Sequence, residues 1–163
     1  MQIKNNSQTW NFQNSYIELP TKLYIKQLPV SVKNPQIIYF NKSLAKELGL
    51  EFLSEEKVAV AEYLSGNKIP EGVALISQAY AGHQFGHFTM LGDGRAVLLG
   101  EQINKNNQRY DIQLKGSGQT PYSRSGDGRA TLSSMLREYI ISESIHHLGI
   151  PTTRSLAVTQ TGE

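Results

Sequence analysis

The sequence contains the pentapeptide Gly-Asp-Gly-Arg-Ala twice, at residues 92–96 and 126–130, and a strand-like segment ending at Lys115 lies between the copies. Each copy combines a flexible backbone, exposed amide donors and one fixed positive charge, which together can bind a phosphate chain. Asp-Gly between apolar segments is also typical of a β-hairpin turn without a ligand, so the first copy alone leaves both interpretations open. The residues that flank the two copies differ, which excludes a repeat architecture.

The charge of the chain favours a small anionic ligand. Its net charge of +2 comes from 16 basic and 14 acidic residues, too even a balance to predict nucleic acid or an anionic membrane as a partner. Some of the basic residues gather instead around the glycine-rich segments: Arg95, Lys115, Arg124 and Arg129. This placement predicts a polyanionic small molecule as the ligand.

Composition excludes several other chemistries. The chain of 163 residues is 39% hydrophobic, enough for one core, and it has no cysteine, so disulfides, thiolate metal sites and a thiol nucleophile are excluded. Residues 1–6 lack the apolar segment of a signal peptide, and no apolar run approaches the roughly 18 residues that a membrane span needs. We therefore expect a soluble cytoplasmic protein.

Residues 1–70 are expected to form an N-terminal arm followed by two short helices. The arm has short β-prone pieces such as residues 36–40. Asn41 or Ser43 can cap the first helix and Gly49 can end it, whereas the second helix is expected to begin at Ser54 and end near residue 65.

Residues 71–163 are expected to form an antiparallel sheet with one long helix, which makes the fold class α+β. The pattern predicts strands at residues 88–91 and 95–100 joined by a tight turn, then a third strand at 109–115 whose alternation puts Lys115 on the polar face. A polar, irregular segment follows. An apolar stripe predicts a long helix from about residue 132 to Gly149, and another strand is expected to begin at Pro151.

Two histidines are candidate metal ligands. His83 and His87 are four residues apart, so a helix would place both on one face. Gly86 weakens a helix, and no third ligand lies nearby in the sequence. Aromatic packing beside a loop is the favoured interpretation.

The long helix carries two candidate partners for Lys115. Glu138 and Glu143 lie about 140° apart around the helix, so both cannot pair with one lysine, and the residues alone do not choose between them. A buried carboxylate that pairs with a strand lysine, together with a glycine loop between the first two strands, is the order of parts in a protein-kinase N-lobe. The loop departs from G-x-G-x-x-G, and the lysine is not in a V-A-I-K context.

Several ordered motifs resemble the selenoprotein O family over essentially the whole chain. They are Asn14-Ser15-Tyr16, Gly82-His83-Gln84-Phe85-Gly86, Leu91-Gly92-Asp93-Gly94-Arg95, Leu114-Lys115-Gly116-Ser117-Gly118, Thr120-Pro121-Tyr122-Ser123-Arg124, Gly126-Asp127-Gly128-Arg129-Ala130, Arg137-Glu138 and Leu148-Gly149-Ile150-Pro151-Thr152-Thr153-Arg154. Together they are far more specific than any one motif.

This resemblance implies a pseudokinase-like enzyme that transfers adenylate from ATP to Ser, Thr or Tyr hydroxyls of proteins, with the nucleotide flipped relative to kinases. It implies a kinase-like N-lobe for residues 71–163 and Glu138, rather than Glu143, as the partner of Lys115. The ATP-binding residues that it implies are Gly92, Gly94, Arg95, Lys115, Asp127 and Gly128.

Family members are several times longer, and their catalytic aspartate and Mg²⁺ ligands belong to a C-terminal lobe. We therefore expect no catalytic base and no metal ligand in this chain, and negligible adenylate transfer by the chain alone. Two alternatives remain: a fragment of a kinase-type phosphotransferase, and a non-catalytic nucleotide-binding module.

Overall fold

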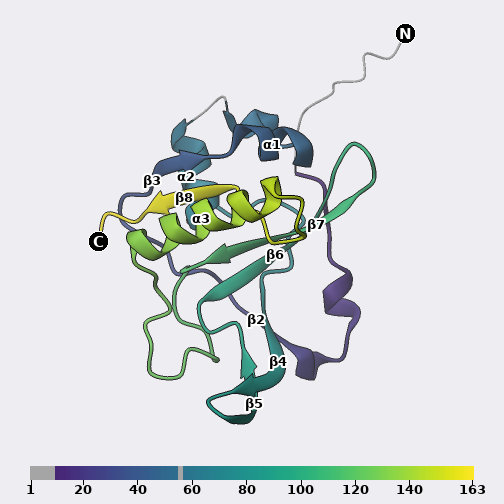
Figure 1. The fold of residues 1–163 in the computed structure, drawn as a ribbon, viewed down its shortest axis with the longest axis vertical. Helices are drawn as coiled ribbons and strands as arrows, with labels where there is room; N and C mark the ends of the chain where they lie inside the picture. Colours follow the sequence, from purple (N-terminus) through teal and green to yellow (C-terminus); the bar gives the residue numbers. More distant parts are fainter. Residues whose placement is uncertain (1–9, 55–56) are drawn as a thin grey trace.

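The structure is a computed structural model that describes residues 10–54 and 57–163. These residues form two antiparallel sheets and three α-helices (Figure 1). The larger sheet contains β1 (Phe12–Gln13), β2 (Tyr24–Lys26), β4 (Ile76–Gln84), β5 (His87–Gly92), β6 (Ala96–Ile103) and β7 (Arg109–Lys115). The smaller sheet contains β3 (Gln36–Phe40) and β8 (Ala157–Gln160). The predicted α+β class is confirmed.

Strand β6 is the centre of the larger sheet. It pairs with β7 on one edge and with β1 and β4 on the other, and seven of its eight residues are buried, as the apolar run at residues 96–99 predicts. In β7, Ile112 and Leu114 are buried while Lys115 is exposed, so the alternation in the sequence correctly predicts the polar face.

The first glycine-rich motif turns the chain at residues 94–95, but it does not join two paired strands, so the predicted hairpin is wrong. Strand β5 pairs with β4, not with β6. On β4, Ala79 pairs with Gly92 of β5, and Ile76 pairs with Leu98 of β6. Three positions of β4 thus face six positions of the chain that contains the motif. Strands β5 and β6 therefore lie end to end along β4, and the motif is a bulged break between them.

The loop expected beside His83 and His87 is the two-residue turn between strands β4 and β5. These strands form a hairpin whose turn follows Gln84, which pairs with His87. His83 lies edge-on against Phe88, with ring centroids 5.6 Å apart, so the favoured aromatic packing is present on strands.

The helices are α1 (Lys42–Leu48), α2 (Lys57–Ser65) and α3 (Leu132–His147), with short 3₁₀ segments η1 (Ser15–Glu18), η2 (Thr21–Leu23) and η3 (Glu51–Ser54). The side chain of Asn41 caps α1 by accepting a hydrogen bond from the backbone N–H of Leu44, and Gly49 follows the last turn. Ser54 closes η3 rather than beginning the second helix. Within the described ranges, no helix is long and apolar enough to cross a membrane.

The N-terminal segment pairs both with the C-terminal strand and with the larger sheet. Strand β8 begins at Ala157, later than predicted, and pairs with β3 instead of extending the larger sheet. Strands β1 and β2 of the arm pair with β6 and β4. Strands before residue 70 thus pair with strands after it, across the boundary that the sequence predicts.

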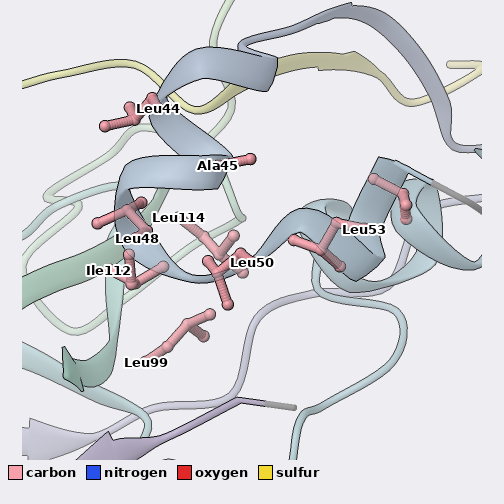
Figure 2. Close-up of a cluster of buried hydrophobic side chains, with 9 residues drawn as sticks. Leu44, Ala45, Leu48, Leu50, Leu53, Leu99, Ile112 and Leu114 are labelled. Atoms are coloured by element: carbon pink, nitrogen blue, oxygen red, sulfur yellow. The ribbon is translucent and has the colours of Figure 1, made fainter. Parts of the chain in front are cut away.

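One hydrophobic core joins the two short helices to the sheet. Leu50, directly after α1, is 0% exposed, and it lies between the helical segment and the side chains of Leu99 and Leu114 on the sheet (Figure 2). The buried members of this cluster are Leu44, Ala45, Leu48, Leu50, Leu53, Val60, Leu99, Ile112 and Leu114. The core therefore holds strand β7, which ends at Lys115.

Candidate functional site

A cleft of about 610 Å³ lies where the two Gly-Asp-Gly-Arg copies meet the ends of β5 and β7. Its lining includes all six residues that the sequence analysis predicts as nucleotide ligands: Gly92, Gly94, Arg95, Lys115, Asp127 and Gly128. Residues 34 positions apart in the sequence, such as Gly94 and Gly128, are thus brought to one site by the fold.

The first loop, residues 92–96, is held in place by Asp93, which was not predicted as a site residue from the sequence. Its carboxylate accepts hydrogen bonds from the backbone N–H of Gln78 (3.1 Å) and from Nε2 of Gln113 (3.2 Å). Burial raises the pKa of this carboxyl, and the two hydrogen bonds oppose that rise. The Thr120 hydroxyl donates to the Asp93 carbonyl oxygen at 2.6 Å. Asp93 therefore positions the loop. In the sequence, its location between two glycines was the feature that could have indicated this role.

The segment at residues 120–124 packs directly on the first loop. A Cβ added at Gly92 would lie 2.3 Å from Cγ of Tyr122, so only glycine leaves room for this ring. The Ser123 hydroxyl donates a short hydrogen bond to the Gly94 carbonyl oxygen. These contacts couple the first loop to the start of the second.

The second loop, residues 126–130, is attached to the segment after β7 and to the N-terminal arm. The backbone N–H of Gly118 donates to the Gly128 carbonyl oxygen at 3.1 Å, and Oδ1 of Asp127 accepts from the backbone N–H of Arg129 at 2.8 Å. The Arg129 guanidinium donates to the carbonyl oxygens of Val30 and Ser31 at 3.3 and 3.5 Å. Arg129 thus anchors the loop as well as lining the cleft.

Lys115 pairs with Glu138 of α3. Nζ of Lys115 lies 2.5 Å from Oε2 of Glu138, and the two side chains are 41% and 48% exposed. The expectation of a buried carboxylate is therefore wrong, because no residue of α3 is fully buried. An ion pair this exposed adds at most about 1 kcal/mol to stability. Its main effect is therefore to hold the ammonium group of Lys115 in position at the cleft.

Glu143 has different partners. Its carboxylate accepts hydrogen bonds from Nε of Arg154 at 2.8 Å, from the backbone N–H of Ser155 at 3.2 Å and from Nδ2 of Asn41 at 2.9 Å. The Arg154 hydrogen bond, opposed by burial, holds the pKa of Glu143 at about 2. Glu143 therefore joins α3 to the start of α1 and to the segment before β8.

This arrangement predicts a pH-dependent contribution to stability. The folded pKa of Glu143 is about 2 against an ordinary value of 4.5, so its stabilisation is complete above about pH 4.5 and is lost as the pH falls towards 2. Replacing Glu143 with glutamine is expected to lower the free energy of unfolding by about 2 kcal/mol at neutral pH. Urea unfolding of both proteins at several pH values measures this, and a constant difference down to pH 2 would contradict the assignment.

Cationic side chains outnumber carboxylates in the lining of the cleft. The cations belong to Arg95, Lys115, Arg124 and Arg129, and the carboxylates to Asp93 and Asp127. Two of the cations also form ion pairs outside the lining, Lys115 with Glu138 and Arg129 with Glu163. Within residues 10–54 and 57–163, the structure has no group of three or more His, Cys, Asp or Glu that could hold a metal ion. The four cations of the lining favour a ligand with several negative charges.

The fold and the cleft define an α+β domain with a basic, glycine-lined binding site. A family model described as "Protein adenylyltransferase SelO" matches residues 6–163. Proteins from Bacillus cytotoxicus, Clostridium botulinum and Brevibacillus brevis, each named "Protein nucleotidyltransferase YdiU", are similar to the chain, with 64%, 63% and 62% identity. The chain belongs to the SelO family, as the motifs of the sequence indicate. Each alignment covers 94% of the chain but 31% of the relative, so the chain spans about a third of their length.

Proposed function

We propose that this chain binds ATP in the cleft and supplies one half of the active site of a protein adenylyltransferase. The observation that carries the proposal is the meeting of two glycine-rich loops with the Lys115–Glu138 pair at one basic cleft. Backbone amides and fixed cations neutralise a triphosphate without any rearrangement during the reaction. The family membership and the names of the relatives, which both refer to nucleotidyl transfer, support the same reaction class.

Each ligand would have a distinct task. The amides near Gly92 and Gly94 and the guanidinium of Arg95 would bind the phosphates from the first loop, and Lys115, oriented by Glu138, would bind them from β7. Asp127 and Gly128 would contact the nucleotide from the second loop, completing the set of ligands.

The transfer would be an in-line displacement at the α-phosphorus. A Ser, Thr or Tyr hydroxyl oxygen of a protein substrate forms the new bond to this phosphorus, the bond to the bridging oxygen of the β-phosphate breaks, and pyrophosphate leaves. The hydroxyl proton would pass to a base outside this chain. The described residues offer no cluster of metal ligands, so Mg²⁺ would also need ligands from elsewhere. The kinase-like character of the fold and a cytoplasmic location are further parts of the proposal.

The test of ATP binding compares Lys115→Ala with the unchanged chain in a calorimetric titration. Loss of one charge-assisted contact is expected to weaken ATP binding about tenfold to 100-fold. Stability is expected to change little, because the ion pair is exposed. The matched control is Lys105→Ala, which removes the exposed Lys105–Glu51 pair (2.9 Å) outside the cleft lining and should leave ATP affinity unchanged.

Labelled ATP separates the reaction classes. In a longer protein that contains this chain, label from the α-phosphate on a protein substrate would indicate adenylate transfer, whereas label from the γ-phosphate would indicate a kinase-type enzyme. The 163-residue chain alone is expected to transfer neither label. Absence of ATP binding by the unchanged chain would refute the proposal that this cleft binds the nucleotide.

A further inference from the structure

Two non-glycine residues with left-handed backbones contact each other beside the cleft. Phe85 has φ 58° and Arg124 has φ 56°, and Cζ of Arg124 lies 5.0 Å from the centroid of the Phe85 ring. The left-handed region is unfavourable for residues with a Cβ, and most of all for bulky ones. Strain of this kind persists where the surrounding structure enforces it, and it gathers at functional sites.

Phe85 occupies a position that turn geometry assigns to other residues. It is the first residue of the two-residue turn between β4 and β5, and both turn residues, Phe85 and Gly86, have positive φ (58° and 80°). Such a turn prefers Asn, Asp or Gly at its first position. The hairpin projects away from the three helices (Figure 1), and Phe85 is 64% exposed, so burial does not offset the strain.

Arg124 is held in its backbone conformation by a tight set of hydrogen bonds. The backbone N–H of Ser123 donates to the Thr120 carbonyl oxygen at 3.0 Å, and the backbone N–H of Gly126 donates to the Ser123 carbonyl oxygen at 2.9 Å. Arg124 lines the cleft, and among the residues that the structure describes no carboxylate forms an ion pair with it. The loop thus directs an unneutralised guanidinium to the site.

We propose that Arg124 is a further phosphate-binding residue of the cleft, and that the Phe85 ring positions its guanidinium. A guanidinium that stacks on an aromatic ring uses its face, so the N–H donors at its edge stay available for phosphate oxygens. The hairpin and the segment at residues 120–124 would then hold one cation at the cleft. This inference rests on the proposed binding of ATP.

The experiment uses substitutions that relieve the left-handed backbone strain at residues 85 and 124. It measures Tm to follow the strain and ATP affinity to follow binding. Arg124→Gly is expected to raise Tm by about 2–4 °C, because glycine accepts the left-handed conformation. The same variant is expected to weaken ATP binding about fivefold to 20-fold and AMP binding about twofold, since AMP carries fewer phosphate charges. Phe85→Asn, which suits the turn but lacks the ring, should raise Tm and weaken ATP binding by about threefold.

Two controls isolate the stacked pair. Phe88→Ala removes another exposed aromatic ring of the hairpin, 62% exposed, and should leave ATP affinity unchanged. Arg124→Lys keeps the charge but not the planar group, and its ATP affinity should fall between those of the unchanged chain and Arg124→Gly.

The outcomes distinguish the two levels of the proposal. If the unchanged chain binds ATP and Arg124→Gly binds it equally well, Arg124 is not a phosphate ligand and the ATP site stands without it. If the unchanged chain binds no ATP, both proposals are overturned. A fall in Tm for Arg124→Gly would overturn the account of backbone strain. Equal losses of affinity for ATP and AMP would contradict a contact between Arg124 and the phosphates that ATP carries and AMP lacks.

Discussion

Replacing Gly128 with alanine is expected to lower the free energy of unfolding by about 2–5 kcal/mol and to abolish ATP binding. Gly128 has φ 70°, and a Cβ there would lie 2.0 Å from the carbonyl oxygen of Gly118. The obstacle is backbone, which cannot rotate away as a flexible side chain would. The loop must therefore shift, and the hydrogen bond between the Gly118 N–H and the Gly128 carbonyl oxygen breaks with it.

Gly149 is the matched control for this substitution. It has φ 77°, but nothing lies within 4 Å of the position of an added Cβ. Gly149→Ala therefore carries the backbone strain alone, and we expect a loss of about 1 kcal/mol. Urea unfolding followed by circular dichroism measures both variants, and calorimetry measures ATP binding. Equal losses of stability in the two variants would show that the close approach to Gly118 is not important.

Replacing Leu50 with alanine is expected to lower the free energy of unfolding by about 3 kcal/mol. The side chain is fully buried between the segment after α1 and the sheet, so its removal costs transfer free energy and leaves a cavity (Figure 2). Leu50 is not among the residues that line the cleft. Below the melting transition, ATP affinity is therefore expected to stay within about twofold of the unchanged chain.

Leu28→Ala is the control for the core substitution. Leu28 is 66% exposed, and a change at such a position is expected to alter stability by less than about 0.5 kcal/mol. Thermal and urea unfolding of the two leucine variants measures the contrast. A loss below about 1 kcal/mol for Leu50→Ala would mean that the core can collapse around the missing side chain.

Local patterns in the sequence predicted several elements correctly. The β-prone piece at residues 36–40 is β3, the alternating segment at 109–115 is β7, and the apolar stripe from about residue 132 belongs to α3. These predictions succeed because side-chain periodicity and helix caps act within a few residues of the chain. The segment at residues 116–131, which the sequence analysis describes as irregular, indeed has no helix or strand.

Pairing between distant segments was harder to predict. Nothing local indicates that β1 pairs with β6 or that β8 pairs with β3. Asp93 was missed as a positioning residue because its partners, Gln78 and Gln113, are 15 and 20 residues away. Phe85 and Arg124 are likewise 39 positions apart and meet only through the fold.

By itself, the sequence determined the family of this protein and which residues could form a basic, glycine-rich site, because residue type and local spacing carry that information. The spacing of residues left open which carboxylate of α3 meets Lys115, and the family resemblance implied Glu138. The tertiary structure decided it: Glu138 pairs with Lys115, whereas Glu143 binds Arg154. The physical reason is that helix periodicity places the two carboxylates on different sides of α3 but does not say which side the sheet occupies. That orientation depends on packing against β8 and on contacts with residues more than 100 positions away, such as Asn41.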